Sequence, residues 1–156
     1  MILKTYEIQK KNKNINEKEI FLLYGENMGL KKDIKELILE EIKKRNSSLE
    51  TILLDENEIL NSEENFYNLL YSKSLFQDKR ALIINRATDK FLKNLEKITQ
   101  KNLNKVVLII ISEILEKKSK LRNHCEKNEN IYCIPCYEDS SKDLEFIAVK
   151  EFKNRK

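Results

Sequence analysis

The stretch "IFLLYGENMGLKKDIKELILEEIKKR", Ile20 to Arg45, decides the fold class. It opens with a continuous apolar run that ends at Gly25, which is the pattern of a buried strand. A helix is predicted next, because apolar residues recur along one face while Lys and Glu lie opposite them. The residues of that face are Leu30, Ile34, Leu37, Ile38 and Ile42. A strand that leads into an amphipathic helix is the unit from which parallel sheets are built.

The same alternation continues along the chain. Further strands are predicted at Leu49–Asp55, Arg80–Asn85, Lys105–Ser112 and Asn130–Ile134. Helices are predicted after Ser62, from Thr88, through Glu116–Lys127 and after Ser140. The strands are continuous apolar runs, which is typical of a parallel sheet covered on both faces. We therefore expect an α/β fold with a mainly parallel five-stranded sheet flanked by helices, in a single domain over residues 1–156.

Composition excludes several classes of protein. The 26 acidic residues are interleaved with 30 basic ones, so the net charge of +4 indicates a solvated mixed surface more than a nucleic-acid site. The longest apolar run, Val106–Ile111, is too short to span a bilayer, and the first residues lack the apolar centre of a signal peptide. Three cysteines suit a reducing compartment better than a disulfide scaffold. These features predict a cytoplasmic protein without a membrane partner.

The turn "GENMGLKK", Gly25 to Lys32, stands where such a fold binds phosphate. A P-loop requires four residues between its glycines, then lysine and a hydroxyl residue that holds magnesium. Here three residues separate Gly25 from Gly29, Leu30 follows the second glycine, and Lys31 comes one place late with no Ser or Thr after it. The sequence predicts a degenerate phosphate loop of Gly25, Gly29 and Lys31.

Two further residues argue against nucleotide hydrolysis. Glu26 would place negative charge beside the phosphates, and the third strand ends in Asn85 and Arg86 where an acidic pair would orient magnesium. The sheet resembles that of a P-loop NTPase whose active site is absent. We expect no cofactor and no catalysis.

The motif "CIPC", Cys133 to Cys136, allows two chemical interpretations. It is similar to a redox motif, and together with His124 and Cys125 it would supply four zinc ligands. Redox motifs normally open a helix early in their fold, however, and one C-x-x-C without a second spaced pair is a weak zinc signal. Structural thiols without a metal are the favoured interpretation.

A basic cluster follows the fourth strand. Its members, the candidate DNA-facing residues, are Lys117, Lys118, Lys120 and Arg122. They could meet phosphates, although a solvated helix face is the simpler interpretation.

Several segments in order resemble the delta subunit of bacterial DNA polymerase III, over nearly the whole chain. They are "LLYGENMGLKKDIKELIL", "SLFQDKRALIINRATDKFLKNLEKI", "LIIISEILEKKSKLRN" and "CIPCYED". The resemblance implies an AAA+ or RecA-like domain that lacks ATP hydrolysis. It also implies a non-catalytic subunit of a DNA-directed DNA polymerase holoenzyme, which is a nucleotidyltransferase. Family members are about twice as long, so the lid and collar domains are expected to be absent from this chain.

The resemblance also implies partners and a binding site. In the family, a hydrophobic pair at a helix end inserts into a pocket of the ring-shaped sliding clamp and helps to open it. Here the matching residues are Leu75 and Phe76, preceded by Ser74, and an apolar pair at an element boundary suits such a role. Other clamp-loader subunits (delta prime, gamma/tau) are implied as partners, and DNA indirectly or weakly. The alternative is a stand-alone α/β enzyme, thioredoxin-like or nucleotide-binding, that uses "CIPC" or "GENMG".

Overall fold

The structure, a computed structural model, describes residues 1–3, 5, 8, 15, 18–46, 48–72, 79–101, 103 and 105–137. Its centre is a five-stranded sheet in the order β2-β3-β4-β1-β5, and every neighbouring pair is parallel. The strands are β1 (Ile20–Tyr24), β2 (Leu49–Asp55), β3 (Lys79–Asn85), β4 (Val106–Ile111) and β5 (Ile131–Pro135). The predicted α/β class and the five-stranded parallel sheet are confirmed.

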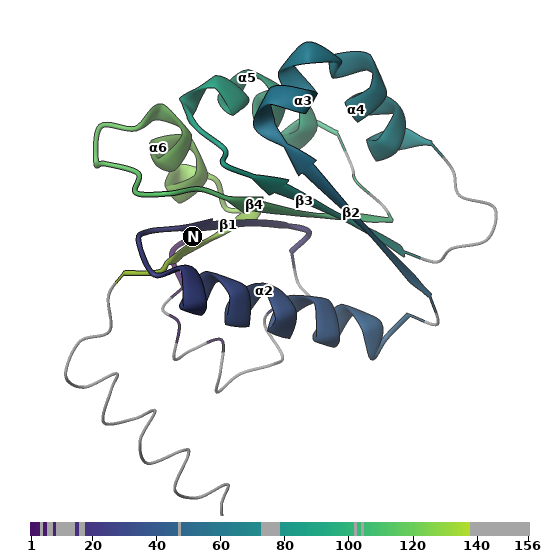
Figure 1. Cartoon of the computed structure of the whole chain (residues 1–156), viewed down its shortest axis with the longest axis horizontal. Coiled ribbons are helices and arrows are strands. Elements are labelled where there is room, and N and C mark those ends of the chain that lie inside the picture. The colour runs from purple at the N-terminus through teal and green to yellow at the C-terminus, as the bar shows by residue number, and fades with distance from the viewer. Residues whose placement is uncertain are drawn as a thin grey trace, which may run out of the picture.

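Helices cover both faces of this sheet (Figure 1). The helix α2 (Met28–Lys43) lies against one face. The opposite face carries α3 (Glu56–Asn61), α4 (Glu63–Tyr71), the short 3-10 helix η2 (Asp89–Phe91), α5 (Leu92–Thr99) and α6 (Lys120–Lys127). No helix in these described ranges is both long and apolar enough to cross a membrane.

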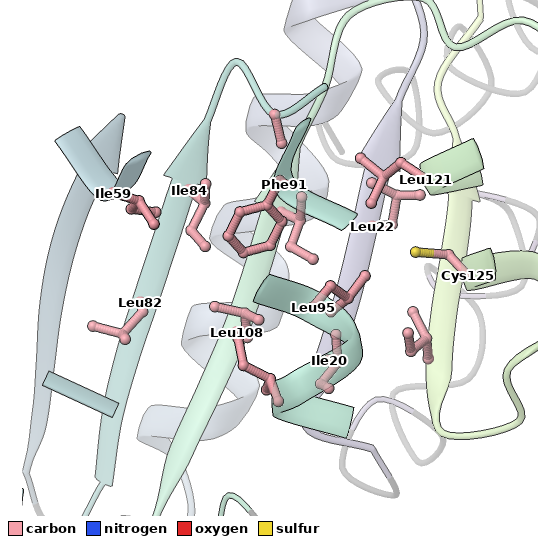
Figure 2. Close-up of a cluster of buried hydrophobic side chains, with 14 of the residues drawn as sticks. Ile20, Leu22, Ile59, Leu82, Ile84, Phe91, Leu95, Leu108, Leu121 and Cys125 are labelled. Carbon is pink, nitrogen blue, oxygen red and sulfur yellow. The ribbon is translucent and has the colours of Figure 1, made fainter. Parts of the chain in front are cut away.

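Each strand contributes to two hydrophobic cores, one on each face. In β1, Leu22 packs in the core under α3–α6, whereas Phe21 and Leu23 pack in the core under α2. Figure 2 shows the first core, where Phe91 and Leu95 project from the helices onto the strands. Both faces of β1, β3, β4 and β5 are therefore buried, which is why their sequences are continuous apolar runs, whereas the edge strand β2 is only partly buried.

The helix beginnings differ in part from those predicted. The short α3 was not predicted, and it starts directly after β2 because of a capping box: Asp55 Oδ1 accepts from the Asn57 N–H, and the Glu58 carboxylate accepts from the Asp55 N–H. The helix predicted from Glu116 begins only at Lys120, because Ser119 caps it.

Two predicted helix starts hold, with different chemistry. A helical segment starts after Thr88, as predicted, and the Thr88 side chain caps η2 by accepting from the Lys90 N–H. Ser62 precedes α4 at the cap position but makes no capping hydrogen bond through its hydroxyl. The helix predicted after Ser140 lies outside the described residues.

Candidate functional site

The Gly25 turn, residues 25–31, comprises the connection from β1 to α2 and the first residues of α2, at the carboxyl ends of the strands (Figure 1). In open parallel α/β sheets this edge is where ligands bind, and backbone N–H groups at the start of a helix are what a phosphate would meet. The partners of those N–H groups therefore decide whether the turn can hold a phosphate.

Three N–H groups of the turn and of the start of α2 have acceptors within the protein. The Gly25 N–H donates to the Glu113 carbonyl oxygen (3.1 Å), and the Asn27 N–H donates to the Cys136 carbonyl oxygen (3.0 Å). At the start of α2, the Leu30 N–H donates to the Asn27 side-chain oxygen (3.0 Å). The turn is thus bound to the segments that follow β4 and β5, and these donors are not directed at a ligand.

The two glycines of the turn have different roles. Gly25 has a φ of +132°, and a Cβ at this position would lie 2.0 Å from the Cys136 carbonyl oxygen. Glycine is therefore required there for the close approach of two backbone segments. Gly29 lies inside α2, and the nearest atom to a Cβ there would be the Asn27 side-chain oxygen at 3.5 Å. Nothing in the geometry of Gly29 requires a glycine.

Lys31 is buried, with 3% of its surface exposed. Its ammonium group donates to the carbonyl oxygens of Gly25 (2.7 Å) and Ser112 (3.0 Å), which follow β1 and β4 respectively. A lysine in a P-loop reaches outward to phosphate oxygens. Lys31 instead joins the ends of two neighbouring strands from inside the protein.

Intramolecular contacts also occupy the carboxyl ends of β2 and β3. Arg86, which has a φ of +56°, donates from Nε to Asp55 Oδ2 (2.7 Å), and this hydrogen bond holds the pKa of Asp55 below its ordinary value. The buried Glu56 carboxylate accepts from the Thr88 N–H (2.7 Å). These two carboxylates stabilise loops of the protein. The strand β3 ends at Asn85, and Arg86 follows it, as expected from the sequence.

The three cysteines are buried free thiols, but "CIPC" does not bring its two together. Cys133 packs with Cys125 in the core under α3–α6, whereas Cys136 packs in the core under α2. Hydrogen bonding between Cys125 and Cys133, together with burial, raises the pKa of the Cys125 thiol, and burial raises the pKa of the Cys136 thiol to about 12. Within the part of the chain that the structure describes, no three metal-ligating side chains gather at one point.

The predicted basic cluster divides into two parts. Lys117, Lys118 and Lys120 are exposed, and Lys118 pairs with Glu116 (2.9 Å). The Arg122 side chain is only 17% exposed.

Arg122 is committed to contacts within the protein. It donates to Glu126 Oε1 (2.7 Å) and to the Leu115 carbonyl oxygen (2.9 Å), and it lies over the ring of Tyr24 at 5.1 Å. Tyr24 in turn donates to Glu126 (3.0 Å), and burial raises the pKa of the Tyr24 hydroxyl. The structure therefore places Arg122 in a packed network that the spacing of the basic residues did not reveal.

The N-terminus of α6 is also occupied. Asp89 accepts from the Ser119 hydroxyl (2.6 Å) and from the Leu121 N–H (2.9 Å). The bond from Ser119 holds the pKa of Asp89 below its ordinary value. An aspartate of the protein itself thus fills the position at which a nucleic-acid phosphate could meet this helix end.

Ser74, Leu75 and Phe76 lie outside the described residues. The structure does define their flanks, since α4 ends at Tyr71 and β3 begins at Lys79. Both flanks lie at the amino edge of the sheet, opposite the Gly25 turn (Figure 1). At this edge Arg80, which the sequence did not single out, contacts the last turn of α4. The only sequence signal for it is a charged residue that opens an apolar strand.

Comparisons with known proteins agree with this fold. The family model described as "DNA polymerase III, delta subunit" matches residues 21–134. Among solved structures, the Bacillus subtilis DNA clamp loader delta protein (YqeN) superposes with a TM-score of 0.60 at 14% sequence identity. The match covers 97% of this chain and 48% of that one, so the chain spans about half the length of that structure. No curated protein matches the chain.

Proposed function

Because the chain belongs to the DNA polymerase III delta subunit family, we propose that it is a clamp-loader domain that binds the sliding clamp and does not use ATP itself. In this proposal residues 1–156 form one AAA+-like domain that corresponds to the amino-terminal domain of the family. Its partners are the sliding clamp and the other clamp-loader subunits. The observation that carries the clamp-loader role is the family match over residues 21–134, and the Gly25 turn closed by Lys31 supports the part of the proposal that concerns ATP.

The absence of ATP use is argued from that turn. A nucleotide needs free N–H donors, an outward lysine and a hydroxyl that holds magnesium. Here the Gly25 and Asn27 N–H groups donate to carbonyl oxygens of the protein, and the Lys31 ammonium is buried. A family member built in this way would have to act on the clamp through binding energy alone. Isothermal titration calorimetry with Mg-ATP should therefore give no binding in the micromolar range.

Clamp binding is assigned to Leu75 and Phe76, with Ser74 beside them. They belong to the connection between Tyr71, the last residue of α4, and Lys79, the first of β3. A hydrophobic pair on such a connection suits insertion into an apolar pocket, and truncation of interface anchors often costs more than about 2 kcal/mol of binding free energy. Lys73 and Gln77 would form the polar rim of the contact.

DNA has at most an indirect part in this proposal. Arg122 is held by Glu126 and Leu115, and Asp89 occupies the N-terminus of α6. Lys117, Lys118 and Lys120 remain exposed, and a few exposed lysines support only weak, salt-dependent contact with phosphates.

Surface plasmon resonance with the sliding clamp of the same organism tests the central claim. The double variant Leu75→Ala, Phe76→Ala should bind on the order of a hundredfold more weakly, because two anchors leave their pocket. The control variants Lys73→Ala and Gln77→Ala should change the dissociation constant much less. Thermal melting of the double variant should stay near that of the parent protein. Unchanged clamp binding by the double variant would refute the assignment.

A further inference from the structure

We propose that Arg80 is a positioning residue for clamp binding: it fixes the end of α4, from which the chain continues to Leu75 and Phe76. This inference rests on the proposed function and extends it to a residue that would not itself touch the clamp. Its basis is a set of contacts that one guanidinium group makes among three elements.

Arg80 lies near the start of β3, and its side chain is 13% exposed. Its Nε donates to Glu50 Oε2 on β2 (2.6 Å), while Nη1 donates to the Leu69 carbonyl oxygen in the last turn of α4 (2.6 Å). Nη1 also donates to the Ser72 hydroxyl oxygen (3.2 Å). Glu50 and Arg80 are direct neighbours in the register of β2 and β3. The guanidinium group thus joins the amino edge of the sheet to the end of α4.

The contact with Leu69 involves a carbonyl oxygen of the kind that a helix end leaves without a partner. Carbonyl oxygens of the last turn have no partner within a helix, and a cation near them is favourable. Arg80 supplies both a donor and the positive charge. The chain leaves α4 at Ser72, whose backbone is extended (φ −66°, ψ 133°) and whose N–H donates to the Asn68 carbonyl oxygen (2.8 Å).

Fixing this exit reduces the cost of binding. Leu75 follows Ser72 by three residues, so the direction of the chain at Ser72 limits where the anchors can lie. If the exit were free, only a fraction of molecules would present the anchors correctly, and the apparent affinity would fall by that fraction. Arg80 would therefore act on the population of binding-competent molecules.

Other contacts should keep α4 folded when Arg80 is replaced. The ring of Tyr71 stacks on that of Tyr67 with their planes 5° apart, and the Tyr67 hydroxyl donates to Asn94 on α5 (2.7 Å). Phe66 and Leu70 are buried in the core below the helix. Loss of the guanidinium group should consequently loosen the exit of the chain without unfolding the domain.

A matched arginine allows the effect to be isolated. Arg86 also pairs with a carboxylate of β2, Asp55, but at the carboxyl edge of the same two strands. The variant Arg86→Gln removes an arginine–carboxylate pair between β2 and β3 and leaves the end of α4 untouched. Arg80→Gln removes such a pair together with both contacts to α4.

The test measures association with the sliding clamp by surface plasmon resonance, at a temperature far below the melting point of each variant. Arg80→Gln should weaken binding about tenfold, mainly through a lower association rate constant, because fewer molecules are competent to bind. Arg80→Lys keeps the charge but cannot reach Glu50 and both α4 acceptors together, so its affinity should be intermediate. Arg86→Gln should bind like the parent protein.

Each outcome bears on one proposal. If the parent protein does not bind the clamp, or if the Leu75→Ala, Phe76→Ala variant binds as well as the parent, the proposed function fails. If that double variant loses binding while Arg80→Gln and Arg80→Lys associate like the parent, only the role of Arg80 is overturned. A lower melting temperature with unchanged association would likewise make Arg80 a purely structural residue. Should Arg80→Gln not fold, Arg80→Lys alone decides in the same way.

Discussion

The two edges of the sheet are built differently. At the carboxyl edge, the Gly25 turn is bound to the segments after β4 and β5, and Lys31 joins the ends of β1 and β4 from inside. At the amino edge, the connection between α4 and β3 departs from a helix end held by Arg80. Parallel α/β sheets usually bind ligands at the carboxyl edge. In this protein that edge stabilises the fold, and the proposed binding function belongs to the opposite edge.

Substitutions at the two edges should therefore have different consequences. A change at the carboxyl edge should alter the free energy of unfolding and leave the clamp affinity of the folded protein unchanged. A change at the amino edge should alter clamp affinity more than stability. Each variant below is accordingly measured for both quantities, with urea denaturation for stability and surface plasmon resonance for affinity.

The largest effect is expected for Gly25→Ala. The added Cβ would lie 2.0 Å from the Cys136 carbonyl oxygen, in a backbone conformation with a φ of +132° that alanine rarely adopts. Strain and displacement of the segment after β5 should lower the free energy of unfolding by about 3–5 kcal/mol. The folded fraction should still bind the clamp like the parent protein. A urea midpoint equal to that of the parent would show that the two segments are not in close contact.

A smaller loss is expected for Lys31→Met. Methionine retains most of the apolar stem but leaves the carbonyl oxygens of Gly25 and Ser112 without their donor. The free energy of unfolding should fall by about 2 kcal/mol, because buried acceptors are costly to leave unsatisfied. If the variant were as stable as the parent protein in urea denaturation, the contacts of Lys31 with the two strands would not stabilise the fold.

Most of the fold could be predicted from the sequence because four of its five strands are buried on both faces. Continuous runs such as Val106–Ile111 are short and uniformly apolar, which distinguishes buried strands from the amphipathic helices between them. The short α3 escaped this reasoning, since Ile59 is its one apolar residue in the buried core. A local signal was present nonetheless: Asp55 and Glu58 have the spacing of a capping box.

The candidate site could be predicted only in part. The spacing of Gly25, Gly29 and Lys31 indicates that a P-loop is missing, but it cannot reveal what replaces one. The acceptor of Lys31 on the neighbouring strand, Ser112, lies 81 residues away in the sequence. The inward position of Arg122 likewise depends on partners from several elements, Tyr24 among them. Contacts of this kind arise from the topology of the sheet and leave no local pattern.

The smallest effect, and the one of opposite sign, is expected for Gly29→Ala. Gly29 lies in the first turn of α2, where a Cβ would meet nothing closer than the Asn27 side-chain oxygen at 3.5 Å. Alanine is favoured over glycine in helices and restricts the unfolded chain, so the free energy of unfolding should rise by about 0.5 kcal/mol. In a turn that cradled phosphate, the second glycine would be needed for close approach of the ligand, and its replacement would abolish binding. Here Gly29→Ala should leave clamp affinity unchanged and should produce no change in calorimetric titrations with Mg-ATP. Micromolar ATP binding by the parent protein that disappears in Gly29→Ala would mean that the carboxyl edge does bind a ligand, and the contrast between the two edges would then be wrong.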